Sequence, residues 1–183
     1  MGRPQILIVE DDGIVALDFL RRVIKMGFDC SQVSSTADDG IMQATRCKPS
    51  LILMDINLKG KPDGVTAART IRSSLGIPVV FITAYSDRDT LNRAKASRPY
   101  GYLLKPCKET DLRMTIYLAL QNHAIAKRLE DDQSRIATTL SNIANRVMRG
   151  RELMRNLDES FAEANGSDVE SVILTSSTSS SPG

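Results

Sequence analysis

Residues 51–58 read LILMDINL, in which four apolar residues are followed directly by an acidic one. An apolar run without polar alternation is typical of a strand that helices cover on both faces in a parallel sheet. Two further runs have this character, ILIV at residues 6–9 and VVFI at residues 79–82. Each run ends in polar residues, so we predict three buried strands.

Segments with helical spacing lie between and after these strands, and each carries charged residues on its other faces. Glycines at the expected turns and a weaker strand at residues 30–33 complete five strand–helix units in roughly 125 residues. With right-handed crossovers, such a chain forms a doubly wound α/β fold that binds ligands at the carboxyl ends of its strands. The helical apolar positions are Ile14, Leu17, Leu20 and Ile24; Val65, Ala68, Ile71 and Leu75; and Leu112, Ile116 and Leu120.

Acidic, hydroxyl and basic side chains follow the carboxyl ends of these predicted strands. In chain order they are Glu10 and Asp11, then Asp55, Thr83 and Lys105. Each residue alone has an ordinary explanation, because acidic residues after strands often cap the next helix and threonine is common at strand ends. The combination is more specific than any member, and it predicts a site at this edge of the sheet.

The motifs ILIVEDD, LILMDINL, FITAY and GYLLKP resemble the response-regulator receiver family over residues 4 to about 125. The resemblance implies a flavodoxin-like five-stranded parallel sheet with strand order 2-1-3-4-5. It also implies a regulator in a two-component phosphorelay, rather than an enzyme, that promotes its own phosphotransfer and autodephosphorylation. The expected partners are a sensor histidine kinase and a downstream protein that the sequence does not identify.

Three carboxylates at one rim repel one another, and oxygen ligands with retained waters suit Mg²⁺. By resemblance, Asp11 and Asp55 bind the metal directly and Glu10 acts mainly through water. The backbone carbonyl of Asn57 is expected to complete the protein's share of the ligands.

The resemblance makes Asp55 the phospho-acceptor, which attacks the phosphorus of a phosphohistidine. Lys105 and Thr83 are expected to contact the phosphoryl oxygens. Tyr102 matches the family's switch aromatic, although taken alone it would be an ordinary packed sheet residue. The Lys105–Pro106 peptide bond is expected to be cis.

One loop departs from the commonest receiver pattern. The segment between Asp55 and Gly64 is one residue longer, and the proline usually found four residues after the phospho-acceptor is replaced by Lys59. This departure concerns the shape of the loop rather than the chemistry of the site.

Residues 126–165 follow the predicted domain, residues 1–125, as a helical extension. Its apolar or small residues recur every three or four positions once Gln133 and Gly150 are included, which indicates a heptad repeat. We interpret it as a parallel homodimeric coiled coil, and the alternative is a helical hairpin with Gly150 at its corner. The repeat comprises Ala126, Leu129, Ile136, Leu140, Ile143, Val147, Met154, Leu157, Phe161 and Ala164.

Other features of the C-terminal part have plainer interpretations. Residues 166–183 are rich in serine and threonine and are predicted to be disordered, with residues 172–174 as a short apolar exception. Four arginines between residues 146 and 155 are expected to be a solvated flank of the repeat. His123 is expected to be a surface or helix-packing residue. The alternative functions are a transcription regulator that binds DNA through the extension, and a degenerate receiver that docks a partner without phosphorylation.

The composition sets few further limits. The 24 Lys+Arg and 22 Asp+Glu residues nearly balance, so no nucleic-acid or membrane partner is required. The three cysteines contain no CxxC pair and predict neither a disulfide framework nor a zinc site. Without an apolar run long enough for a membrane span, the chain is expected to be cytoplasmic.

Overall fold

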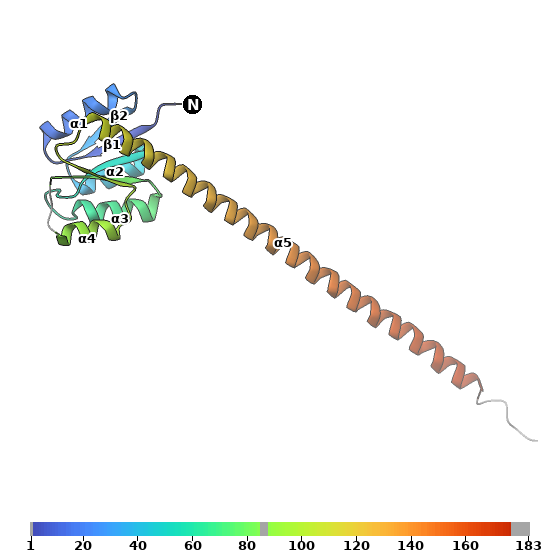
Figure 1. Cartoon of the computed structure of the whole chain (residues 1–183). Coiled ribbons are helices and arrows are strands. Elements are labelled where there is room, and N and C mark those ends of the chain that lie inside the picture. The colour runs from blue at the N-terminus through green and yellow to red at the C-terminus, as the bar shows by residue number, and fades with distance from the viewer. Residues whose placement is uncertain (1, 85–87, 177–183) are drawn as a thin grey trace, which may run out of the picture. The chain divides into compact units, whose positions relative to one another are not determined.

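A computed structural model describes residues 2–84 and 88–176 of the chain. Strands and helices alternate, as the apolar runs predicted (Figure 1). The elements are β1 (Gln5–Val9), α1 (Gly13–Lys25), β2 (Asp29–Ser34), α2 (Ala37–Cys47), β3 (Leu51–Asp55), α3 (Gly64–Leu75), β4 (Val79–Thr83), α4 (Arg88–Ala96), β5 (Gly101–Leu104) and α5 (Glu109–Ser176).

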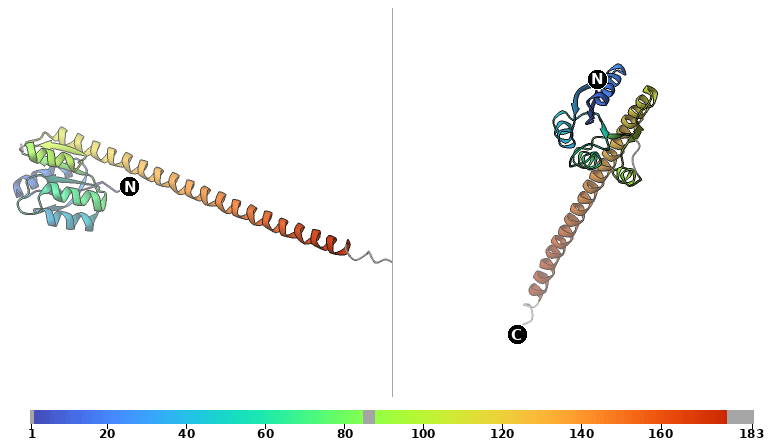
Figure 2. Two further views of the ribbon diagram at one scale, coloured as in Figure 1. Left: turned by 90° about the horizontal axis from the view of Figure 1, so that it is seen from below. Right: turned by 90° about the vertical axis from the view of Figure 1, so that its left-hand side faces the viewer.

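The five strands form one parallel sheet in the order β2-β1-β3-β4-β5, which confirms the predicted topology. Alternate strand residues contribute to two separate apolar clusters, because successive side chains point to opposite faces of a sheet. One cluster packs against α2, α3 and α4, and the other against α1 and α5. Figure 2 shows these helices from two further directions. Both faces of the sheet are therefore covered, as the unbroken apolar runs predicted.

The face that α1 buries differs from the predicted one. Ile14 and Ile24 are 84% and 53% exposed, whereas Phe19 and Val23 are buried in the core. Leu20 of the predicted stripe is partly buried against the core, as expected. Both sets of residues have helical spacing, so the pattern alone favoured a face rotated from the buried one. Phe19 fills more volume than the aliphatic alternatives, and the inward stripe includes it.

Side-chain caps define where the helices begin, because the first helical N–H groups lack partners within the helix. Asp12 accepts hydrogen bonds from the backbone N–H groups of Ile14 and Val15 before α1, while Asp63 caps α3. Gly76 ends α3 in the left-handed conformation, with φ of 66°. These short-range signals place the strand ends, and hence the site, at one edge of the sheet.

The chain divides into two compact units, residues 1–128 and 129–183. Helix α5 continues without interruption through Gly150 to Ser176, so the hairpin corner considered at Gly150 is not formed. The disorder predicted from residue 166 is corrected for residues 166–176, which α5 includes; the densest run of serines and threonines begins only at Thr175, near the end of this helix. Residues 177–183 lie outside the described residues.

None of the described helices is both long and apolar enough to span a bilayer.

Candidate functional site

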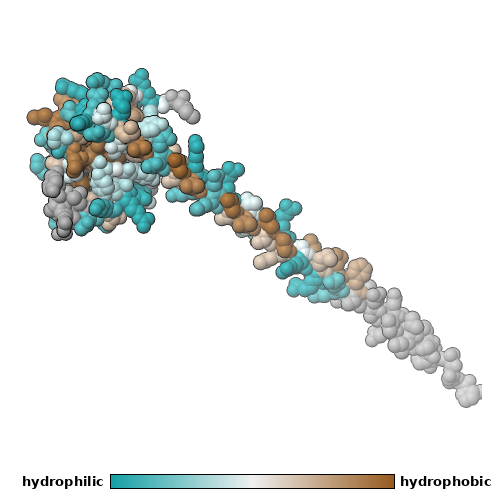
Figure 3. Space-filling view, in the orientation of Figure 1, coloured by the Kyte–Doolittle hydropathy of each residue, from teal (hydrophilic) through white to brown (hydrophobic). Residues whose placement is uncertain are grey.

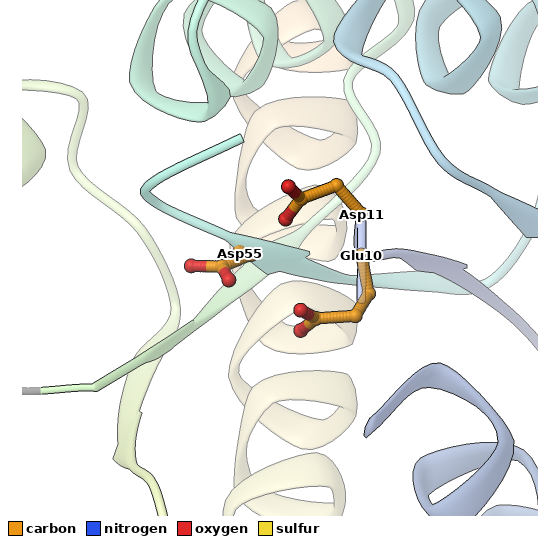
Figure 4. Close-up of side chains that lie close together, drawn as sticks. All are labelled: Glu10, Asp11 and Asp55. Carbon is orange, nitrogen blue, oxygen red and sulfur yellow. The ribbon is translucent and has the colours of Figure 1, made fainter. Parts of the chain in front are cut away.

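The site lies where β1 and β3, neighbours in the sheet, reach their carboxyl ends. Val9 pairs with Met54 in the parallel register, so Glu10 and Asp55 follow at matching heights. One carboxylate oxygen from each of Glu10, Asp11 and Asp55 lies within 4.8 Å of the others (Figure 4). The sheet thus brings together the three acidic residues that the sequence predicted.

Backbone contacts fix Asp55 in place. The backbone N–H of Asn57 donates a hydrogen bond of 3.0 Å to Asp55 Oδ1. On the other side, α3 begins with Gly64 directly against the Asp55 backbone. A Cβ atom on Gly64 would lie 1.9 Å from the Asp55 carbonyl oxygen, which no real side chain tolerates. Gly64 therefore belongs to the architecture of the site, although it has no functional group of its own.

Lys105 places its ammonium group between two of the carboxylates. Its Nζ lies 2.6 Å from Glu10 Oε2 and 2.7 Å from Asp55 Oδ2. The side chains of Lys105, Glu10 and Asp55 are only 16%, 1% and 9% exposed, so water screens these ion pairs weakly. Burial acts to lower the pKa of Lys105, but the hydrogen bonds to Asp55 and Glu10 outweigh it and raise that pKa. Lys105 is therefore a fixed cation beside Asp55.

Glu10 experiences opposing influences. Burial raises the pKa of its carboxyl group, the hydrogen bond from Lys105 lowers it, and the nearby Asp55 charge raises it; the net direction is upward. The carboxylate also accepts a hydrogen bond of 3.4 Å from the backbone N–H of Asp12. Glu10 is thus a buried acid that depends on a neighbouring cation to remain ionised.

Thr83 and Tyr102 lie on the adjoining strands, where the sequence placed them. Thr83 is fully buried at the end of β4, and its hydroxyl donates a hydrogen bond of 3.2 Å to the carbonyl of Ala84. The backbone N–H of Lys105 donates to the Thr83 carbonyl at 2.8 Å, which ties β5 to β4 beside the site. Tyr102 is 38% exposed, with its ring centroid 5.9 Å from that of Phe81.

Lys59 also reaches the site, and sequence reasoning missed this contact. Its Nζ lies 3.0 Å from Asp11 Oδ2, although the lysine side chain is 88% exposed. The hydrogen bond and charge of Asp11 raise the pKa of Lys59. The only signal was the lysine's unusual position four residues after Asp55, which indicated a change in loop shape and not an ion pair.

The donor set fits Mg²⁺. The three converging groups are all carboxylates, which are hard oxygen ligands of the kind that this ion prefers. Two of them are buried and held by backbone and lysine contacts, so the geometry is set by the protein. Glu10, Asp11 and Asp55 are therefore able to hold a divalent cation, which would compete with Lys59 and Lys105 for these oxygens.

Two other sequence expectations concern residues near the site. The Lys105–Pro106 peptide bond is cis, as predicted, and Lys61–Pro62 is cis as well. His123 contacts Tyr100: its Nδ1 lies 3.3 Å from the Tyr100 hydroxyl and its ring meets the Tyr100 ring edge-on. His123 thus packs from α5 against Tyr100, in line with the expected surface or helix-packing residue.

Comparison with known proteins agrees with this geometry. The family model described as "Response regulator receiver domain" matches residues 6–117. Among solved structures, the signal receiver domain of a modulated diguanylate cyclase from Desulfovibrio desulfuricans G20 is 31% identical with a TM-score of 0.66. That match covers 68% of this chain and 99% of the other.

Curated relatives are similar over the same region. The transcriptional regulatory protein PdtaR of Mycobacterium tuberculosis is 29% identical over 136 residues, which cover 74% of this chain and 66% of PdtaR. The phyllosphere-induced regulator PhyR of Methylorubrum extorquens is 31% identical over 127 residues, covering 69% of this chain and 47% of PhyR. The matched region is thus less than two thirds of each relative's own length.

Proposed function

This chain belongs to the response-regulator receiver domain family, and from that membership we propose that it accepts a phosphoryl group on Asp55 from a sensor histidine kinase. The observation that carries the proposal is the convergence of Glu10, Asp11 and Asp55 with Lys105 already hydrogen-bonded to Asp55. A regulatory protein of this kind acts in the cytoplasm, where the kinase donates the phosphoryl group.

In the proposed step, a carboxylate oxygen of Asp55 attacks the phosphorus of a phosphohistidine. The new bond joins that oxygen to phosphorus, while the phosphorus–nitrogen bond breaks and its electron pair returns to the imidazole. Asp11, Asp55 and the Asn57 carbonyl, with Glu10 through water, would hold Mg²⁺, whose positive charge would offset the repulsion between the anionic reactants. Asn57 N–H keeps the other Asp55 oxygen oriented.

After transfer, Lys105 would exchange its contact with Asp55 Oδ2 for a phosphoryl oxygen. Thr83 would turn its hydroxyl from the Ala84 carbonyl toward another phosphoryl oxygen. Because that hydroxyl now makes a single local hydrogen bond, its reorientation costs little. The movement is proposed to reach Tyr102, which is partly exposed on β5 and packs its ring beside that of Phe81. The same residues would support slow autodephosphorylation.

The output is proposed to pass through protein contact and self-association. The second unit begins inside α5, and its apolar side chains have no partner among the described residues. We propose that residues 126–165 form a homodimer interface. The DNA-binding alternative gains no support from a segment that is one continuous helix to Ser176.

The test uses the full chain, a small phosphodonor and Mg²⁺, with intact-mass measurement. One phosphoryl group should add to the wild type and none to Asp55→Asn. Asp38→Asn, which changes an exposed acid on α2, is the matched control and should still be modified. Equal incorporation into wild type and Asp55→Asn would disprove the assignment.

A further inference from the structure

The second unit exposes an apolar seam along α5. The seam consists of the heptad positions from Leu129 to Phe161, and Figure 3 shows apolar side chains recurring along this part of the helix. Its large members are each more than half exposed, which is unusual for a helix in water unless a partner covers it. They are Leu129, Ile136, Leu140, Ile143, Val147, Met154, Leu157 and Phe161.

Charged residues that flank the seam differ in sign along its length. Asp132 and Arg146 each stand just before a seam position, on what we call the leading flank. Glu130 and Arg151 each stand just after one, on the trailing flank. On both flanks the acidic residue comes early in the helix and the basic residue comes late. Asp158 lies on the trailing flank near the end of the seam.

Flanking charges of this kind set the orientation of paired helices. In a parallel pair, leading residues face trailing residues five positions further along the partner, so Arg146 would face Arg151 of the partner subunit. In an antiparallel pair, each flank faces the same flank. Asp132 would then lie beside Arg146 of the partner subunit, and Glu130 beside Arg151 of the partner subunit. The antiparallel arrangement replaces repulsion with attraction.

Two seam positions without an apolar side chain, Gln133 and Gly150, also favour the antiparallel arrangement. An antiparallel register that places Leu140 opposite the partner's Ile143 also places Gln133 opposite the partner's Gly150. The long side chain then fills the space that glycine leaves. A parallel pair would instead stack Gln133 on Gln133 and Gly150 on Gly150, which leaves a void layer in the seam. Side-chain volume therefore selects this register, and the flanking charges favour the same antiparallel orientation.

We propose that the seam binds a second copy of this chain in antiparallel orientation, with the symmetry axis between Leu140 and Ile143. This inference rests on the proposed self-association and replaces the parallel arrangement that the heptad pattern alone favoured. We infer that the partner is a second copy of this chain, because two seams running in opposite directions match each other in both charge and side-chain volume.

The first test is charge reversal in the full chain, with the dimer dissociation constant measured by sedimentation equilibrium at low salt. Arg146→Glu should raise that constant by about tenfold, because both symmetric contacts become acid against acid. In a parallel dimer the same change would lower it, by pairing Glu with Arg151 of the partner subunit. Adding Asp132→Arg should restore wild-type affinity. Arg149→Glu, with the same charge change on the outer face, is the control.

The second test is disulfide formation in a background with the three native cysteines changed to alanine. A mixture of Leu140→Cys and Ile143→Cys chains should form mixed dimers, and Ile143→Cys alone should not link to itself. Efficient self-linking of Ile143→Cys, or tighter dimers for Arg146→Glu, would overturn the antiparallel arrangement alone. A full chain that stays monomeric at high concentration would overturn the proposed self-association and this inference with it.

Discussion

Replacing Lys105 with methionine should destabilise the domain by an amount that depends on pH. The substitution keeps an unbranched side chain of comparable length but removes the ammonium that bridges Glu10 and Asp55 at 2.6 and 2.7 Å. Both carboxylates are almost fully buried, so solvent does not replace the lost cation. Two anions would then share one site without compensation.

The size of the effect follows from this burial. Removing one partner from a buried ion pair costs about 3–5 kcal/mol, and the partial exposure of Lys105 favours the lower limit, about 3 kcal/mol. Proton uptake by Glu10 relieves the penalty, because burial already raises the pKa of that group. A carboxyl group with a raised pKa in the folded state binds a proton more tightly there than in the unfolded chain. This binding stabilises the folded protein at pH values below the unfolded-state pKa, and the stabilisation is lost as the pH rises through the folded-state pKa. The penalty should therefore be small near pH 4.5 and full near pH 8.

Urea unfolding followed by circular dichroism, with a chelator present, measures this difference. A loss of about 3 kcal/mol corresponds to a midpoint lower by about 2 M for a domain of this size. Lys108→Met removes an exposed lysine nearby and is the matched control. If Lys105→Met and Lys108→Met unfold at the same urea concentration near pH 8, Lys105 does not stabilise the acidic site as we infer.

Three further outcomes are expected. Lys59→Ala should lower the dissociation constant for Mg²⁺ by about two- to fivefold in calorimetry, because the ammonium no longer occupies Asp11, whereas Lys61→Ala should leave it unchanged. Gly64→Ala should cost about 3 kcal/mol of unfolding free energy or more, since the new methyl group overlaps a backbone oxygen; an unchanged urea midpoint would contradict the close packing. Burial raises the pKa of the Cys30 thiol to about 11, so at neutral pH this residue should react with a thiol reagent far more slowly than the two half-buried cysteines, and mass mapping of the labelled sites would detect the opposite order.

The sequence was sufficient to predict where the acidic and basic groups meet. Asp55 and Lys105 are distant in the chain, but each directly follows a short apolar run, and parallel strands must bring such ends to one edge of the sheet. The rule that side chains alternate between faces then accounts for the two apolar clusters. These predictions depend only on local patterns that tertiary packing does not alter.

Other features depend on packing and were not predictable in this way. On α1 two apolar stripes have helical spacing, and packing of the larger Phe19 into the core leaves Ile14 exposed. The ion pair between Lys59 and Asp11 depends on the path of an irregular loop, for which sequence spacing gives no rule. Helix α5 extends past residue 165 to Ser176, because the residues before Thr175 still alternate serine with apolar and acidic residues that a helix accommodates.

The backbone hydrogen bond from Lys105 to the Thr83 carbonyl has a consequence for how the site would respond to a bound phosphoryl group. The two residues proposed to contact its oxygens sit side by side on β4 and β5, joined at 2.8 Å through their main chains. Displacing either strand end must move both contacts together. Thr83 and Lys105 would therefore respond to a phosphoryl group as one unit. The free-energy changes caused by substituting each residue alone should not add up to the change in the double variant.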